Sequence, residues 1–134
     1  MKKIVLGTAQ FSGNYGFIKE KKNFTKKNAQ KILKTFLSKN LRHLDTSADY
    51  KGSIKKISSL NYGNWKITTK IDPKSLDFSS EKNLYLSFEK QIKNLKKELS
   101  IKTIKNLLIR NANIFLTSKG KILFKTLKKI KRDK

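Results

Sequence analysis

Residues 41–50 read LRHLDTSADY, a short apolar stretch that ends on Asp45 and runs into a polar loop. Two later apolar stretches have the same form, and they end on Lys70 and Arg110. Each of the three is followed by loop residues and then by a helical pattern. Folds built from such βα units carry their active sites at the carboxyl ends of parallel strands. The repeated arrangement therefore predicts a parallel α/β fold with functional side chains at the strand ends.

The rest of the sequence extends this pattern to four strands and four helices. Short runs of β-branched and apolar residues predict strands at residues 3–8, 41–44, 65–71 and 104–109. Apolar residues at helical spacing predict helices at residues 25–40, 54–60, 80–99 and 122–130. Strands that alternate with helices favour one parallel sheet with right-handed crossovers. The first and last strands would each leave a free edge unless the sheet closes or pairs with another chain.

Composition limits the classes of protein to consider. The 134 residues suffice for one domain over 1–134, and the absence of cysteine excludes disulfides and thiolate metal sites. No apolar run approaches the roughly 18 residues of a membrane span, so a cytoplasmic location is the default. The net charge of +24 suggests either a polyanion-binding protein or a lysine-rich solvated surface. We favour the second, because the lysines are spread along the chain and arginine is scarce.

Three of the polar residues near strand ends could form an acid-catalysis unit. Asp45 and Tyr50 lie in one loop, and Lys70 ends the next strand along the chain. A lysine beside a tyrosine stabilises the phenolate and lowers the phenol pKa, while a carboxylate holds the lysine in place. Such a tyrosine can protonate a carbonyl oxygen while hydride reaches the carbon. The plainer alternative is a helix cap or a surface ion pair.

Several motifs together resemble the aldo/keto reductases, and most closely their bacterial branch with an LGTAQFG opening. The motifs are LGTAQF, NYGF, LDTSADYKGS, WKITTKID and NLYLSFEKQIKNLKKELSIKTIKNLLIRN, which together span nearly the whole chain. The resemblance implies a TIM barrel, an NADP(H) cofactor and the reduction of aldehydes or ketones. It assigns the catalytic roles to Asp45, Lys70 and Tyr50, with Tyr50 as the proton donor. Thr8 and Gln10, after the first strand, become candidate cofactor contacts, although Gln10 can equally be a turn residue.

Two departures from this family pattern bear on activity. The family motif at the fourth strand end closes on a histidine, whereas LLIR places Arg110 there. A guanidinium donates hydrogen bonds but adds a fixed charge and cannot act as a neutral imidazole. The single histidine, His43, lies inside a predicted strand and is expected to be a packed or edge residue. A TIM barrel also needs eight βα units, so the fold predicted here is an open (βα)4 half-barrel, truncated relative to the family.

Three hypotheses for the function follow from these observations. The first is a truncated oxidoreductase of the aldo/keto reductase type that acts on a small carbonyl substrate, with its activity and its cofactor binding in doubt. The second is a basic half-barrel that binds RNA or another polyanion. The third is a half-barrel that assembles as a homo-oligomer, because an apolar inward face and free edges would drive association. No membrane partner and no metal are expected.

Overall fold

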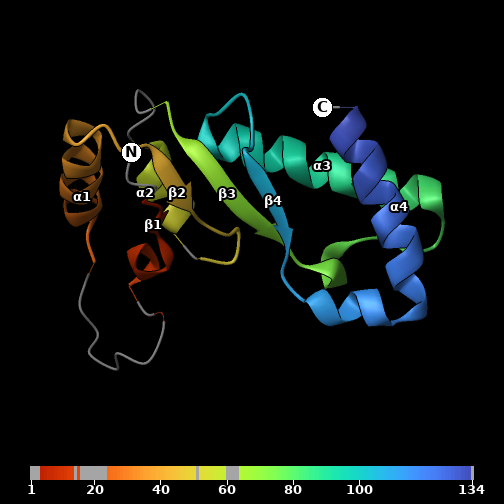
Figure 1. The fold of residues 1–134 in the computed structure, drawn as a ribbon. Coiled ribbons are helices and arrows are strands. Elements are labelled where there is room, and N and C mark those ends of the chain that lie inside the picture. Colours follow the sequence, from red (N-terminus) through yellow and green to blue (C-terminus); the bar gives the residue numbers. More distant parts are fainter. Residues whose placement is uncertain (1–3, 14, 16–23, 51, 60–63, 134) are drawn as a thin grey trace. The chain divides into compact units, whose positions relative to one another are not determined.

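The computed structural model describes residues 4–13, 15, 24–50, 52–59 and 64–133. Strands and helices alternate along the chain as the sequence predicts (Figure 1). The strands are β1 (Leu6–Gly7), β2 (His43–Asp45), β3 (Lys66–Ile71) and β4 (Asn106–Ile109). The α-helices are α1 (Lys26–Ser38), α2 (Ser53–Ser58), α3 (Glu81–Leu99) and α4 (Ser118–Arg132). Residues 3 and 60, which the sequence assigns to the first strand and the second helix, lie outside the described residues.

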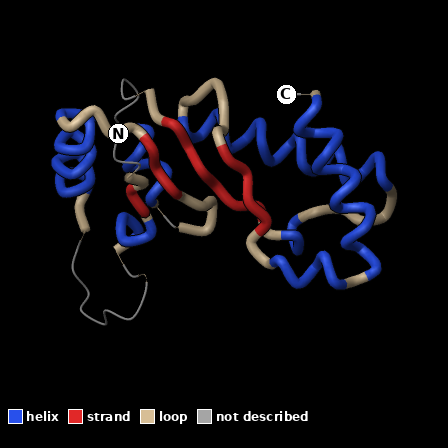
Figure 2. The backbone as a smooth tube through the Cα atoms, viewed as in Figure 1, coloured by secondary structure: helices blue, strands red, loops and turns tan. Residues whose placement is uncertain are grey.

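The four strands form one parallel sheet in the order β1-β2-β3-β4 (Figure 2). In the register of β1 with β2, Gly7 is the partner of Asp45. In the register of β2 with β3, Asp45 is the partner of Thr68. Consecutive strands are therefore neighbours, as expected for successive βα units, and the fold is a (βα)4 half-barrel.

The loops that follow three of the strands contain short 3₁₀ helices that hydrophobic spacing did not predict. These are η1 (Ala9–Ser12), η3 (Pro73–Ser75) and η4 (Ala112–Leu116). In two of them the residue before the helix accepts a local hydrogen bond: Asp72 from the Lys74 N–H, and Asn111 from the Asn113 N–H. Such side-chain caps favour tight turns over extended loops. The polar turn residues were visible in the sequence, but the runs are too short to show a helical period.

Side-chain capping explains where two of the long helices begin. Thr25 and Asn28 form a reciprocal capping box at the start of α1. The hydroxyl of Ser80 accepts the Asn83 N–H at 3.0 Å, just ahead of α3. After α1 the chain turns through Asn40, which has a φ of 56°. Asparagine tolerates this left-handed conformation better than most residues, so the predicted end of this helix is confirmed.

Contacts within the chain group it into two compact units. The first unit comprises residues 1–70 and 95–108. Its core includes Leu33 of α1, Leu44 of β2, Ile57 of α2 and Ile67 of β3, each with no exposed surface. Because side chains alternate across a strand, Leu44 and Ile67 lie on the opposite face from their polar neighbours.

That opposite face of β2 and β3, which we call the polar face, carries His43, Asp45, Lys66, Thr68 and Lys70. The expectation of an apolar inward face is therefore wrong for these strands. The physical reason is the period of two along a strand. The sequences HLD and KITTK place every one of their charged or imidazole side chains on a single face.

The second unit comprises residues 71–94 and 109–134. Its core includes Leu84 and Phe88 of α3 and Leu123 and Ile130 of α4, all buried. Gly120, near the start of α4, lies against the backbone of Phe115 so closely that an added Cβ would be 2.4 Å from its carbonyl oxygen. Glycine is thus required where the last 3₁₀ helix meets α4.

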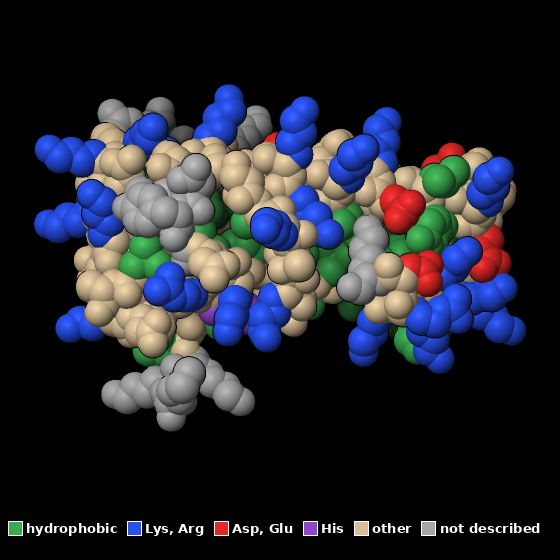
Figure 3. Space-filling view, turned by 90° about the horizontal axis from the view of Figure 1, so that it is seen from above, with side chains coloured by type: hydrophobic (Ala, Val, Ile, Leu, Met, Phe, Trp, Pro, Cys, Tyr) green, Lys and Arg blue, Asp and Glu red, His purple; other side chains and the backbone are tan. Residues whose placement is uncertain are grey.

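Lysine and arginine side chains occur over the whole face of the molecule shown in Figure 3, and they do not gather in one patch. Within the described ranges, no helix is long and apolar enough to cross a membrane. The same residues hold no group of three or more histidine and carboxylate side chains that could bind a metal ion.

Candidate active site

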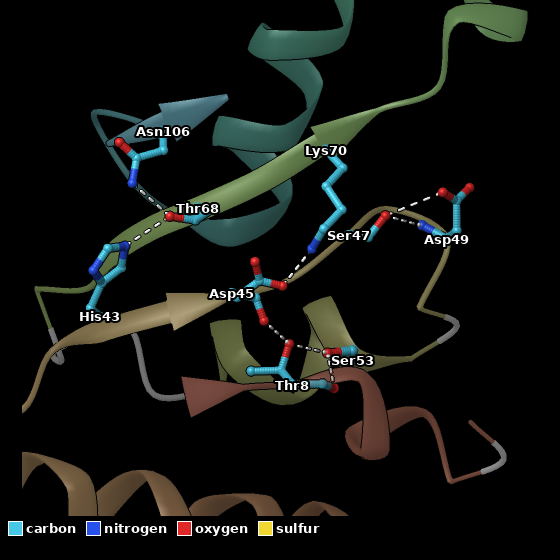
Figure 4. A network of polar contacts seen from close by, with 9 residues as sticks. All are labelled: Thr8, His43, Asp45, Ser47, Asp49, Ser53, Thr68, Lys70 and Asn106. Atoms are coloured by element: carbon cyan, nitrogen blue, oxygen red, sulfur yellow. Dashed lines mark hydrogen bonds and ion pairs between the residues drawn. The ribbon is translucent and has the colours of Figure 1, made fainter. Parts of the chain in front are cut away.

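The centre of the candidate site is an ion pair between neighbouring strand ends in the first unit. Asp45 is the last residue of β2, and Lys70 is the next-to-last residue of β3. The Lys70 Nζ lies 2.5 Å from the Asp45 Oδ1 (Figure 4), and the two side chains are 23% and 31% exposed, respectively. Lys70 lies two residues beyond Thr68, the register partner of Asp45, and therefore on the same face of the sheet, so its long side chain can reach the carboxylate.

Tyr50 joins this pair from the loop that follows β2. Its side chain is 8% exposed, and the Lys70 Nζ lies 5.6 Å from the centre of its ring. This separation is within the range over which an ammonium group and an aromatic ring attract each other. Tyr15 meets Tyr50 edge to face, with ring centres 4.9 Å apart. The three residues that the sequence singled out as an acid-catalysis unit are thus close together.

Burial raises the pKa of the Tyr50 phenol above its ordinary value of 10.0, and a hydrogen bond with Tyr15 raises it further. The charge of Lys70 acts in the opposite direction and lowers this pKa, while the Asp45 carboxylate raises it. The sequence led us to expect a lowered pKa, because it showed the lysine but could not show the burial. A phenol with the ordinary pKa of 10.0 is already protonated at neutral pH, and the raised pKa extends this protonated range to higher pH.

Local hydrogen bonds set the path of the loop between Asp45 and Tyr50. The Ser47 hydroxyl donates to the Asp49 carboxylate at 3.2 Å, and the Tyr50 N–H donates to the Ser47 carbonyl at 3.1 Å. Gly52, with a φ of 76°, then turns the chain into α2. Glycine adopts this conformation at no steric cost, so the loop closes back onto the strand end within a few residues.

The two predicted cofactor contacts differ in how accessible they are. Thr8 has no exposed surface, and its hydroxyl donates to the Asp45 carbonyl oxygen at 2.9 Å. Gln10 is exposed, and its Nε2 donates to the Tyr15 carbonyl at 2.5 Å. Of the two side chains, only that of Gln10 could meet a ligand without rearrangement.

Arg110, the residue in the family's histidine position, directly follows β4 and belongs to the second unit. Its backbone N–H donates to the Ile71 carbonyl at 3.0 Å, and its side chain is exposed. Its place beside Tyr50 remains a prediction.

Two hydrogen-bonded groups near the site were not predicted, although Thr8 and His43 were named individually. Ser53 and Thr8 form a buried hydroxyl pair behind Asp45 (Figure 4). On the polar face, the Thr68 hydroxyl lies between His43 and Asn106. The period of two could have placed Thr68 on the same face as Lys70. Nothing in the sequence indicates that Ser53, distant along the chain, would reach Thr8.

Comparison with solved structures supports the half-barrel. Two similar structures are both described as candidate aldo-keto reductases of Pseudomonas aeruginosa. One is 20% identical to this chain with a TM-score of 0.70, and the other is 19% identical with a TM-score of 0.69. In each case the match covers 98% of this chain, but only 51% and 50% of the respective solved chains.

Sequence comparison adds no closer relationship, because no known family profile matches the chain. No curated protein matches it either. At this level of identity the structural matches establish the fold, and they give no support to the alternative of a polyanion-binding protein. The chain thus spans about half the length of the solved chains it matches.

Proposed function

We propose that this chain carries the proton-donating part of an aldo/keto reductase site that reduces aldehydes or ketones. The observation that supports this most directly is the Asp45–Lys70 ion pair at neighbouring strand ends, with Lys70 5.6 Å from the ring centre of Tyr50. An arrangement of carboxylate, ammonium and phenol in a partly buried site suits general acid catalysis better than it suits stabilisation of the surface.

Each of the three residues has a defined part in this proposal. Tyr50 donates its proton to the carbonyl oxygen of the substrate as hydride reaches the carbonyl carbon. Lys70 stabilises the phenolate that remains, because its charge lowers the pKa of Tyr50. Asp45 holds the ammonium group of Lys70 in place at 2.5 Å. The phenol, whose ordinary pKa of 10.0 is raised here, is protonated at neutral pH, so the proton is available before the reaction begins.

The hydride donor in this proposal is NADP(H), which is the cofactor implied by the sequence resemblance. The described residues fit this cofactor only in part, because the Thr8 side chain is buried and its hydroxyl is already donated to Asp45. We therefore assign proton transfer to this chain and leave hydride delivery to groups beyond these residues. A second set of four βα units, on this or another chain, would complete the barrel and hold the cofactor.

Arg110 stands where the family has the histidine that orients the substrate. Its part in orienting the substrate stays a prediction from the sequence, because Arg110 belongs to the second unit. We place this activity in the cytoplasm.

An aldehyde reduction assay tests the proposal. The purified chain is mixed with NADPH at high concentration and a panel of aromatic aldehydes, and the oxidation of NADPH is followed by its absorbance. The high NADPH concentration offsets the weak binding expected of this chain alone, so we expect slow but measurable turnover. Tyr50→Phe should reduce it about 100-fold or more, as is typical when a general acid is removed. Tyr85→Phe is the matched control, since Tyr85 lies on α3 in the second unit. Equal rates for the wild-type chain and Tyr50→Phe would remove Tyr50 from the proposed role.

A further inference from the structure

Ser53 is the first residue of α2 and has no exposed surface. Its hydroxyl lies 3.1 Å from the carbonyl oxygen of Thr8 and 3.2 Å from the Thr8 hydroxyl. The N-cap position of α2 is Gly52, which has no side chain, and the Ser53 hydroxyl reaches a residue 45 positions away in sequence. Ser53 therefore ties the start of α2 to the end of β1.

Thr8 extends this connection to the candidate site. Both its N–H and its hydroxyl donate to the carbonyl oxygen of Asp45, each at 2.9 Å. The carbonyl of Asp45 thus accepts two hydrogen bonds from one residue that is itself fully buried. Two hydrogen bonds to one carbonyl oxygen restrict the backbone at Asp45. They therefore restrict the direction in which the Asp45 side chain leaves the end of β2 (Figure 4).

Ser53 also contacts the other end of the same loop. Its backbone N–H donates to the Tyr50 carbonyl oxygen at 2.9 Å. One residue is therefore bonded directly to Tyr50 through its backbone and to the anchor of Asp45 through its side chain. These two bonds connect the backbone at Tyr50 to the backbone at Asp45 through Ser53 and Thr8.

We propose that Ser53 is a positioning residue, which acts through Thr8 to hold the Asp45–Lys70 pair at its working distance from Tyr50. This inference rests on the proposed function, because it assigns to Ser53 the task of keeping Lys70 close enough to stabilise the Tyr50 phenolate. The competing explanation is that the two hydroxyls only satisfy each other in the core. That explanation predicts a loss of stability on mutation but no change in the interaction between Lys70 and Tyr50.

A double-mutant cycle with the Tyr50 titration as its readout separates the two explanations. The ring of Tyr50 is labelled with ¹³C, and its titration is followed by NMR in the full chain. Lys70→Met should raise the titration midpoint of Tyr50, because it removes the charge that lowers it. In the Ser53→Ala background the same substitution should raise the midpoint by half as much or less.

A second test and two controls show whether the effect is specific to the hydrogen bonds between Ser53, Thr8 and Asp45. Thr8→Val removes the middle hydroxyl and should reduce the Lys70→Met response in the same way, whereas Thr8→Ser retains the hydroxyl and should preserve the response. Ser58→Ala, at the end of the same helix, should preserve it too, since the Ser58 hydroxyl donates locally to Lys55. Circular dichroism shows which variants are folded. If Ser53→Ala does not fold, the comparison of Thr8→Val with Thr8→Ser distinguishes the two explanations.

An undiminished response in folded Ser53→Ala or Thr8→Val would overturn the proposal, as would the failure of both variants to fold, since the role would then be structural. The proposal would also be overturned if Lys70→Met alone left the titration midpoint of Tyr50 unchanged, because there would then be no interaction between Lys70 and Tyr50 to maintain. Aldehyde turnover is measured separately. If the chain shows no turnover but the Tyr50 titrations of the double-mutant cycle are as expected, the proposed function is contradicted and the positioning role of Ser53 is retained.

Discussion

The imidazole Nε2 of His43 on β2 lies 2.8 Å from the hydroxyl oxygen of Thr68 on β3. The Nδ2 of Asn106 on β4 donates to the same oxygen at 2.9 Å. One threonine hydroxyl thus joins three neighbouring strands on the polar face, close along β3 to the candidate site. The sequence indicated that His43 was a packed or edge residue, and it is half-buried and hydrogen-bonded within the sheet.

Replacing Thr68 with valine should destabilise the sheet. The substitution keeps the shape of the side chain but leaves His43 and Asn106 without their shared partner, which should lower the free energy of unfolding by about 1–3 kcal/mol. Thr69→Val is the matched control, because the Thr69 hydroxyl is buried and has no hydrogen-bond partner among the described residues. Urea denaturation should show the control to be neutral or stabilised. Equal losses for the two variants would contradict the role given to Thr68.

The titration of Tyr50 should respond to its two neighbours in opposite directions. Lys70→Met removes the charge that lowers the pKa of Tyr50, so the pKa should rise. Tyr15→Phe removes a hydrogen bond that raises it, so the pKa should fall. Labelled tyrosine NMR measures both changes, with the signals assigned through Tyr50→Phe. A shift of the same sign in the two variants would contradict this account.

The raised pKa of Tyr50 also predicts how stability depends on pH. The folded chain holds this proton more tightly than the unfolded chain, whose phenol has the ordinary pKa of 10.0. The contribution of Tyr50 is therefore fully present below about pH 10 and is lost as the pH rises through the folded pKa. Tyr50→Phe should weaken the fall of unfolding free energy above pH 10, which denaturation at several alkaline pH values would measure.

Gly120 should tolerate no side chain. A Cβ there would lie 2.4 Å from the Phe115 carbonyl oxygen, so Gly120→Ala must displace backbone, and we expect a loss of about 1–3 kcal/mol in the free energy of unfolding. Gly7→Ala is the control, since no atom lies within 4 Å of the position its Cβ would take. Thermal unfolding of the two variants side by side should show a lower midpoint for Gly120→Ala. A midpoint equal to that of the wild-type chain would show that the contact is relaxed in solution.

The purified chain should bind NADPH weakly or not at all. The chain spans about half the length of the barrels it matches, and the Thr8 side chain is buried beneath Asp45. Arg110→His should not restore useful turnover, because it would change one side chain and leave the cofactor without the rest of its site. Isothermal titration measures the binding, and micromolar affinity for the monomeric chain would show that these residues suffice.

The chain should associate as salt increases. Ile4 and Val5, next to β1, are 46% and 45% exposed, and Leu108 on β4 is 44% exposed, so the two edge strands present apolar side chains. The charge of +24 opposes association, but exposed charges are largely screened beyond about 8 Å at physiological ionic strength. We expect a dimer or larger oligomer at about 150 mM salt and more monomer at low salt. Sedimentation that shows a stable monomer at every salt concentration would refute this.

The sequence by itself determined the order of strands and helices, because short apolar runs and apolar residues at a helical spacing of about 3.6 are local properties of the chain. It also placed Asp45 and Lys70 at strand ends, and parallel strand ends necessarily meet at one edge of a sheet. The cap at Thr25 and the turn at Asn40 were equally readable, since both depend on neighbouring residues.

Only the tertiary structure decided how the site is held and how its phenol titrates. Ser53 and Thr8 are 45 residues apart, so their hydrogen bond exists only once α2 has packed behind β1. The sequence showed the lysine that lowers the pKa of Tyr50, but the burial that raises it depends on groups brought together by folding. Burial and long-range hydrogen bonds depend on residues that are distant in sequence and come together only in the folded chain, so local sequence patterns do not reveal them.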